Sequence, residues 1–136
     1  MKKLNVVLVV LFAIILATAS QAKSSSNENS KENHLDVTDI VKNLEMGTKS
    51  DNFGLKVSST YELGNYNTSR SIINLMRVLH DDKDVEARIA AALSLIKIGD
   101  ARGVYAVKRA ATFDESQRVR KLCSKFYSDF ILANKN

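Results

Sequence analysis

The stretch ARIAAALSLIKIGDAR, residues 87–102, decides the fold of this chain. Its apolar residues recur at the spacing of one helix face, which predicts a helix over residues 85–98. The three consecutive alanines let another helix approach closely, and Gly99 stands where a helix should stop. A second helix is predicted over residues 101–112. Because the link between the two is short, they are expected to pack as antiparallel neighbours.

The same periodicity extends outward from this stretch. It predicts further helices over residues 37–44, 54–63, 69–80 and from 114 to about 130. Asp36 can cap the first of them, and an aspartate of residues 81–84 can cap the helix that begins at Val85. Helices this short are not stable alone in water, so they must pack on one another. The sequence therefore predicts one all-α domain over residues 35–133, with a frayed tail at 134–136.

The chain repeats itself at a shift of 32 residues. Residues 69–79 align with 101–111, and residues 82–98 align with 114–130. Gly64 and Gly99 break this shift by three residues, which we assign to a longer loop over residues 64–68. A unit of this length with two helices predicts a short right-handed α-solenoid of antiparallel helical hairpins, with about six helices in all.

The stretch at residues 87–102 also resembles the first helix and turn of a HEAT repeat of the short, phycobilisome-lyase-like type. The resemblance is carried by Ala87-Arg88, the alanines that follow, and the closing Ile98-Gly99-Asp100. Residues 119–130 are similar but lack the closing Gly-Asp, and residues 55–65 lack the arginine. It covers residues 35–130 and implies a HEAT-like architecture in an exported bacterial protein. It implies little about function, because such a fold mainly provides a surface.

The N-terminus has the layout of a secretory signal peptide over residues 1–22. A basic start is followed by an apolar run over residues 4–16 and a small-residue exit, with cleavage expected after Ala19 or Ala22. The alternative is an uncleaved anchor, although the run is short for a membrane span. Residues 23–34 carry no apolar side chain before the domain and are expected to form a flexible polar linker. No cysteine comes directly after the apolar run, where a lipid anchor would be attached, so we expect a periplasmic or secreted protein without a lipid anchor.

Charge and cysteine content narrow the function classes. Removal of Lys2 and Lys3 with the signal peptide lowers the formal net charge from +5 to +3. This is too mild for a nucleic-acid binder, and an exported protein rarely meets nucleic acid. Cys123 is the only cysteine, so no internal disulfide can form and the fold depends on its apolar core.

No catalytic, cofactor or metal site is expected. His34 and His80 have no second set of ligands at useful spacing. Cys123 aligns with Ala91, an interior position, and is expected to be a small core residue. Arg88 and Arg120 recur at one repeat position, where the family resemblance implies pairing with aspartates of adjoining turns; the candidates are Asp82, Asp84 and Asp114.

The candidate binding residues form a stripe on the second helices. Arg70 and Arg77 share a helix face, and Arg102 and Arg109 repeat them one unit later, with Ile73 and Tyr105 on the same stripe. These residue types are enriched at protein interfaces. The sequence therefore predicts a non-enzymatic protein-protein interaction module, an adaptor or scaffold that binds an acidic protein segment on its concave face. No small-molecule substrate, nucleic acid or membrane partner is expected, except through an uncleaved signal segment.

Three alternatives remain open at this point. The stripe can be a solvated helix face with no partner. The chain can be a structural or stabilising subunit of an envelope complex that packs through the open ends of the solenoid. A lyase-like enzyme is the least favoured, because the sequence offers no nucleophile-base pair and no phosphate loop.

Overall fold

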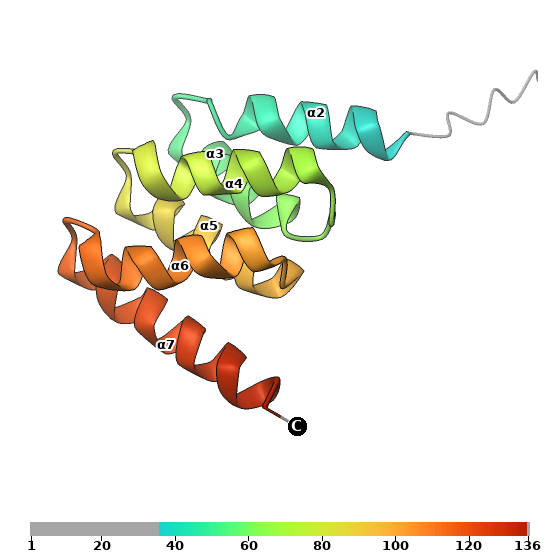
Figure 1. Ribbon diagram of the computed structural model, residues 1–136. Helices are drawn as coiled ribbons and strands as arrows, with labels where there is room; N and C mark the ends of the chain where they lie inside the picture. The colour runs from blue at the N-terminus through green and yellow to red at the C-terminus, as the bar shows by residue number, and fades with distance from the viewer. Residues whose placement is uncertain (1–35, 136) are drawn as a thin grey trace, which may run out of the picture. The chain divides into compact units, whose positions relative to one another are not determined.

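A computed structural model describes residues 36–135, and this part of the chain consists of helices and turns without strands (Figure 1). Its helices are α2 (Val37–Gly47), α3 (Phe53–Leu63), α4 (Ser69–Asp81), α5 (Val85–Ile98), α6 (Ala101–Phe113) and α7 (Gln117–Ala133). The predicted all-α class is thus confirmed for these residues. The predicted signal peptide and polar linker lie outside the described residues. None of the six helices is long and apolar enough to span a bilayer.

Local chemistry explains where the helices begin and end. The carboxylate of Asp36 accepts a hydrogen bond from the Thr38 N–H at 3.1 Å, which caps α2 as expected. Gly99 has a φ of 74°, in the left-handed region, and its N–H donates to the Leu95 carbonyl at 3.0 Å. Glycine adopts this conformation without a steric penalty, so α5 stops at the predicted residue.

One detail of the capping differs from the prediction. Asp84 is the N-cap residue of α5, but its carboxylate makes no capping hydrogen bond and instead binds Lys56. The turn before α5 is held by Asp82, whose side chain accepts from the Asp84 N–H at 2.9 Å. The longer loop is where it was expected: residues 64–68 join α3 to α4, whereas only residues 99–100 join α5 to α6.

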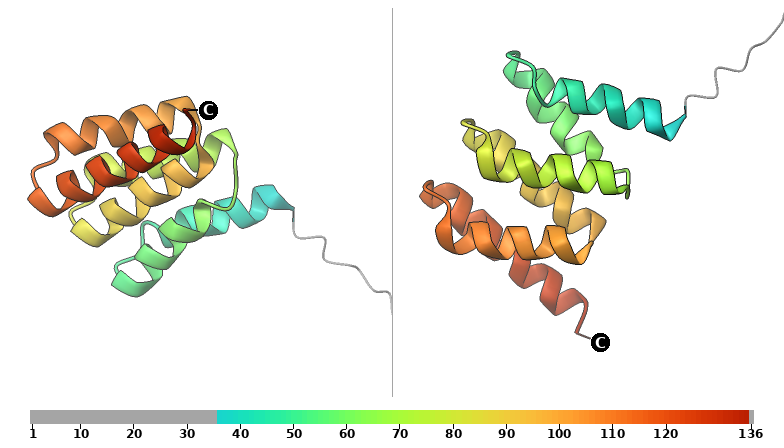
Figure 2. Two further views of the ribbon diagram at one scale, coloured as in Figure 1. Left: turned by 90° about the horizontal axis from the view of Figure 1, so that it is seen from below. Right: turned by 45° about the horizontal axis from the view of Figure 1, so that its top comes forward.

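The helices of the described residues form two rows (Figure 2). In the first row α4 contacts both α2 and α6, and in the second α5 contacts both α3 and α7. Consecutive helices also pack on each other across the rows, as α4 does on α5 and α6 on α7. Each helix therefore buries its apolar face mainly against its nearest neighbours in the chain and in its row.

The core lies around α5. Ala91, Ala92 and Leu95 of this helix have no exposed surface, and neither has Cys123 of α7. Leu95 is packed so closely against Gly103 that a Cβ atom there would lie 2.8 Å from the Leu95 Cδ2. The alanines are thus buried in the core, and the cysteine occupies an interior position as its alignment with Ala91 indicated.

Most of the side chains that helix α3 buries are polar. Ser59 and Thr60 are both inside the molecule, and the Thr60 hydroxyl donates to the Lys56 carbonyl one turn earlier at 2.8 Å. The Ser94 hydroxyl of α5 lies within 3.1 Å of the Thr60 carbonyl. The Thr60 and Ser94 hydroxyls thus both have hydrogen-bond partners, which offsets the cost of burying them. Packing against α5 therefore stabilises α3.

Candidate functional site

Buried basic residues of α3 and α5 bind the turn that precedes the next helix of the same row. The Arg88 guanidinium donates to both carboxylate oxygens of Asp114 at 3.0 Å, and its side chain is only 4% exposed. It also donates to the Asp82 backbone carbonyl at 2.8 Å. The predicted structural pairing of Arg88 is thus confirmed, with Asp114 as the partner. This bidentate pair fixes one turn against another rather than presenting a site to ligands.

The predicted pairing of Arg120 with an aspartate carboxylate is wrong. Its guanidinium donates to the backbone carbonyls of Asp114 at 2.6 Å and Glu115 at 3.0 Å. The geometry toward its own turn is that of Arg88, which reaches the carbonyl six residues earlier in the same way. Within residues 36–135, the carboxylate of Asp114 is instead taken by Arg88.

Lys56 is a structural residue that the sequence reasoning missed. Its ammonium group lies 2.7 Å from Asp84 and 3.3 Å from Asp82, with 10% of its side chain exposed. The hydrogen bond that Lys56 donates to Asp84 raises the pKa of Lys56, against the opposing effect of burial, and the same bond lowers the pKa of Asp84. The 32-residue repeat aligns Lys56 with Arg88 in the sequence, although the first copy has no arginine. This alignment was the sequence signal for the role of Lys56.

The six residues of the predicted stripe differ in what they contact. Arg70 pairs with Glu45 of α2 at 2.7 Å. Hydrogen bonds from Lys49 and from Arg70 lower the pKa of the Glu45 carboxyl. Arg102 pairs with Asp100 of its own turn at 3.0 Å. Neither arginine lines the groove that is described below. These two positions fit local ion pairs of the helix surface.

The other arginines of the stripe, Arg77 and Arg109, make no ion pair with any described carboxylate. Arg77 donates to the Asn74 side chain at 3.1 Å, and Arg109 lies over the ring of Phe113 at 5.8 Å. Tyr105 and Ile73 are 62% and 61% exposed. Tyr105 therefore offers a large apolar surface to solvent beside an uncompensated charge.

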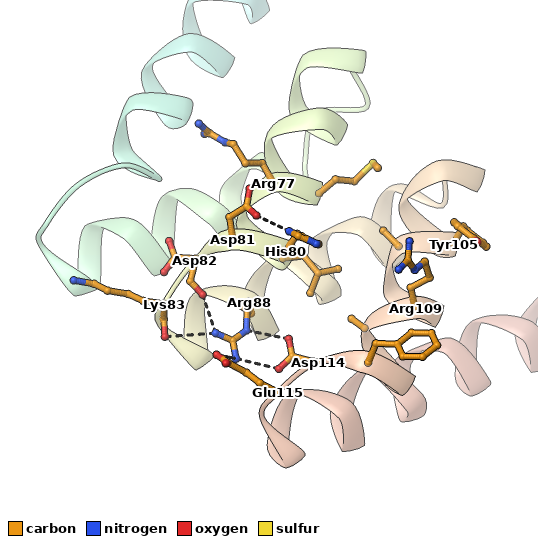
Figure 3. Close-up of a pocket in the computed structure, with 15 residues that line it drawn as sticks. Arg77, His80, Asp81, Asp82, Lys83, Arg88, Tyr105, Arg109, Asp114 and Glu115 are labelled. Atoms are coloured by element: carbon orange, nitrogen blue, oxygen red, sulfur yellow. Dashed lines mark hydrogen bonds and ion pairs between the residues drawn. The ribbon is translucent and has the colours of Figure 1, made fainter.

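Arg77, Tyr105 and Arg109 all line a groove of about 670 Å³ between α4 and α6, in which the Arg77 side chain points away from the other two (Figure 3). Arg77 stands on the α4 side, Tyr105 and Arg109 stand on the α6 side, and the Arg88–Asp114 pair lies near the two turns. Arg70, Ile73 and Arg102 are not part of it. The remaining lining residues are Met76, Leu79, His80, Asp81, Asp82, Lys83, Ala106, Ala110, Phe113 and Glu115. The structure thus joins half of the predicted stripe to residues of the turns, which a comparison of helix faces could not reveal.

The charged side chains that line the groove differ in whether they have an ionic partner. Three carboxylates in it contact a cation: Asp82 contacts Lys56, and Asp114 and Glu115 contact Arg88. Asp81 contacts the ring of its neighbour His80. By contrast Arg77, Lys83 and Arg109 have no ionic partner among residues 36–135. The groove therefore combines an apolar lining with positive charge that is open to an incoming anion.

Among the described residues, His80, Asp81 and Cys123 carry groups that commonly act in catalysis. His80 and Asp81 are in contact, with both side chains largely exposed, and no serine, threonine or cysteine lines the groove. Cys123 is fully buried, which raises the pKa of its thiol to about 12. No group of three or more His, Cys, Asp or Glu side chains in residues 36–135 is placed to hold a metal ion. His34 lies outside the described residues.

No protein-family model matches the chain, and no curated protein matches it at a significant level.

Proposed function

We propose that this protein is a binding module that holds an acidic, partly apolar segment of another protein in the groove between α4 and α6. The observation that carries the proposal is that two arginines of the groove, Arg77 and Arg109, make no ion pair within residues 36–135, whereas Asp82, Asp114 and Glu115 each contact a cation. An anionic side chain can pair with either guanidinium without breaking an ion pair.

The apolar lining restricts the partner further. Tyr105 is 62% exposed and Phe113 is 73% exposed, and both border the groove together with Met76. Aromatic, arginine and methionine side chains are enriched at protein interfaces because they bury large areas at low entropic cost. A segment with apolar residues between its acidic ones, such as an amphipathic helix, matches this arrangement.

We further propose that the two rows of helices are a short right-handed solenoid of antiparallel HEAT-like hairpins. Two features support this: α4 and α5 each contact the neighbours expected in such a stack, and Lys56, Arg88 and Arg120 lie 32 residues apart with related contacts. The signal-peptide pattern of residues 1–22 supports a periplasmic or secreted protein. A partner is therefore to be sought in the cell envelope or the secreted space.

Selection of peptides from a random displayed library tests the proposed groove. We expect recovered peptides to be rich in Asp and Glu interleaved with apolar residues, and their binding to weaken as salt rises. The double variant Arg77→Glu/Arg109→Glu should lose these peptides by about a hundredfold or more in affinity, because like charges oppose each other at the contact.

The matched control is Arg70→Glu/Arg102→Glu, which makes the same charge change outside the groove. Both pairs are exposed, so all four substitutions should leave the helical circular dichroism spectrum nearly unchanged. Equal loss of binding in the two double variants would show a general charge effect. Retention of the peptides by Arg77→Glu/Arg109→Glu would place the binding site elsewhere and contradict the proposal.

A further inference from the structure

Three turns of the described chain share one hydrogen-bonding pattern at an interval of 32 residues. In each, a side-chain oxygen accepts the backbone N–H two residues later: Ser50 from Asn52 at 3.1 Å, Asp82 from Asp84 at 2.9 Å and Asp114 from Ser116 at 2.8 Å. A basic residue follows six positions after each of these oxygens. The repeat thus equips every unit with an acceptor turn and a cation.

The cation of each unit reaches the acceptor turn of the next. Lys56 binds Asp82 and Asp84, and Arg88 binds Asp114 at 3.0 Å and Glu115 at 3.5 Å. Arg120 is the third cation of the series. Among residues 36–135 it binds only the carbonyls of its own turn, so its contact to a following unit is not made.

The other end of the series carries the complementary group. The first acceptor turn begins at Ser50, and Asp51 takes the place that Glu115 has in the third turn. Asp51 is exposed and pairs with no cation of the described chain. At the third turn Arg88 contacts two carboxylates, those of Asp114 and Glu115. A cation placed in the same way beside the first turn would contact the Ser50 hydroxyl and the Asp51 carboxylate.

Apolar surface is exposed on the first and last helices of the second row. Leu55 of α3 is 51% exposed, whereas Ala87 and Val119, its equivalents one and two units later, have no exposed surface. Ile131 of α7 is 42% exposed. The contact that buries the Leu55 position in the later units is therefore not made within residues 36–135.

We propose that copies of this chain associate head to tail, with α7 of one copy on the α2–α3 end of the next. Arg120 of the first copy then binds Asp51 and Ser50 of the second, as Arg88 binds the third turn within one chain. Such a contact is heterologous, so it builds linear or ring-shaped assemblies rather than a symmetric dimer. It uses none of the groove residues and is independent of the proposed function.

Sedimentation velocity across a range of concentrations tests this, with protein purified after expression of the full sequence. The wild type should gain mass above the monomer as its concentration rises. Asp51→Lys should weaken the association about tenfold or more, because it places like charges together. Asp51 makes no contact that the fold needs, so this variant should keep its helical spectrum. Arg120→Glu should act in the same direction.

The charge-exchanged double variant Asp51→Lys/Arg120→Glu should regain association, since opposite charges then face each other again. Lys121→Glu is the matched control, because it changes an exposed charge beside Arg120 that has no role in the series. A wild type that stays monomeric at all concentrations overturns the proposal. So does an Asp51→Lys variant that associates as the wild type does.

Discussion

At the scale of single residues, the burial of an ion pair decides how much it matters. Arg88 and Asp114 have side chains that are 4% and 7% exposed, whereas Arg118 and Glu86 are 63% and 39% exposed. Each pair joins a residue of α5 to a residue later in the chain, 26 positions away for Arg88 and 32 positions away for Glu86. Removing one partner of a buried pair leaves an uncompensated charge in a medium that solvates it poorly.

We therefore predict that Arg88→Ala lowers the free energy of unfolding by about 3–5 kcal/mol. Arg118→Ala, which deletes the same side chain from an exposed pair, should cost less than about 1 kcal/mol. Urea unfolding followed by circular dichroism measures both. Similar losses in the two variants would mean that Asp114 finds water or another partner when Arg88 is removed.

At the scale of elements, Lys56 of α3 and Asp84 at the start of α5 join two helices that are distant in sequence. The contact lowers the pKa of Asp84, chiefly through the hydrogen bond from Lys56. The folded state therefore binds this proton less readily than the unfolded state, whose pKa is about 3.9. The stabilisation is complete above that value and is lost as the pH falls through the lower pKa of the folded state.

Replacement of Asp84 by asparagine should expose this dependence. At pH 7 we expect Asp84→Asn to unfold at a lower urea concentration than the wild type, because Lys56 loses its nearest anion. The difference between the two proteins should shrink as the pH is lowered below about 3.9. A difference of constant size from pH 7 to pH 2 would assign the effect to the shape of the turn instead of its charge.

At the scale of the whole molecule, α5 connects the parts of the described domain. It contacts α3, α4, α6 and α7, and Leu95 at its centre is fully buried. Loss of packing at Leu95 therefore destabilises both rows of helices. The domain is therefore expected to unfold as one cooperative unit when this side chain is truncated.

Leu95→Ala should cost about 2–5 kcal/mol, since it removes buried methyl groups and leaves a cavity. Leu93→Ala is the matched control two residues away, where the leucine is 38% exposed, and it should cost about 1 kcal/mol or less. Far-ultraviolet circular dichroism and tyrosine fluorescence should give one coincident transition in each variant. Separate transitions, or equal costs at the two positions, would show that α5 is not the common core.

The sequence by itself determined the helices, because helix formation depends on neighbours three and four residues apart. The apolar spacing, Asp36 and Gly99 were enough to locate them to within a few residues, and the repeat placed Ala91 and Cys123 inside. Tertiary structure alone decided the binding surface, since the contacts involved span many residues of chain. It neutralised Arg70 with Glu45, left Arg77 and Arg109 without ionic partners among residues 36–135, and placed both arginines along one groove. Which charge is free depends on the folded neighbours, and helix spacing carries no information about them.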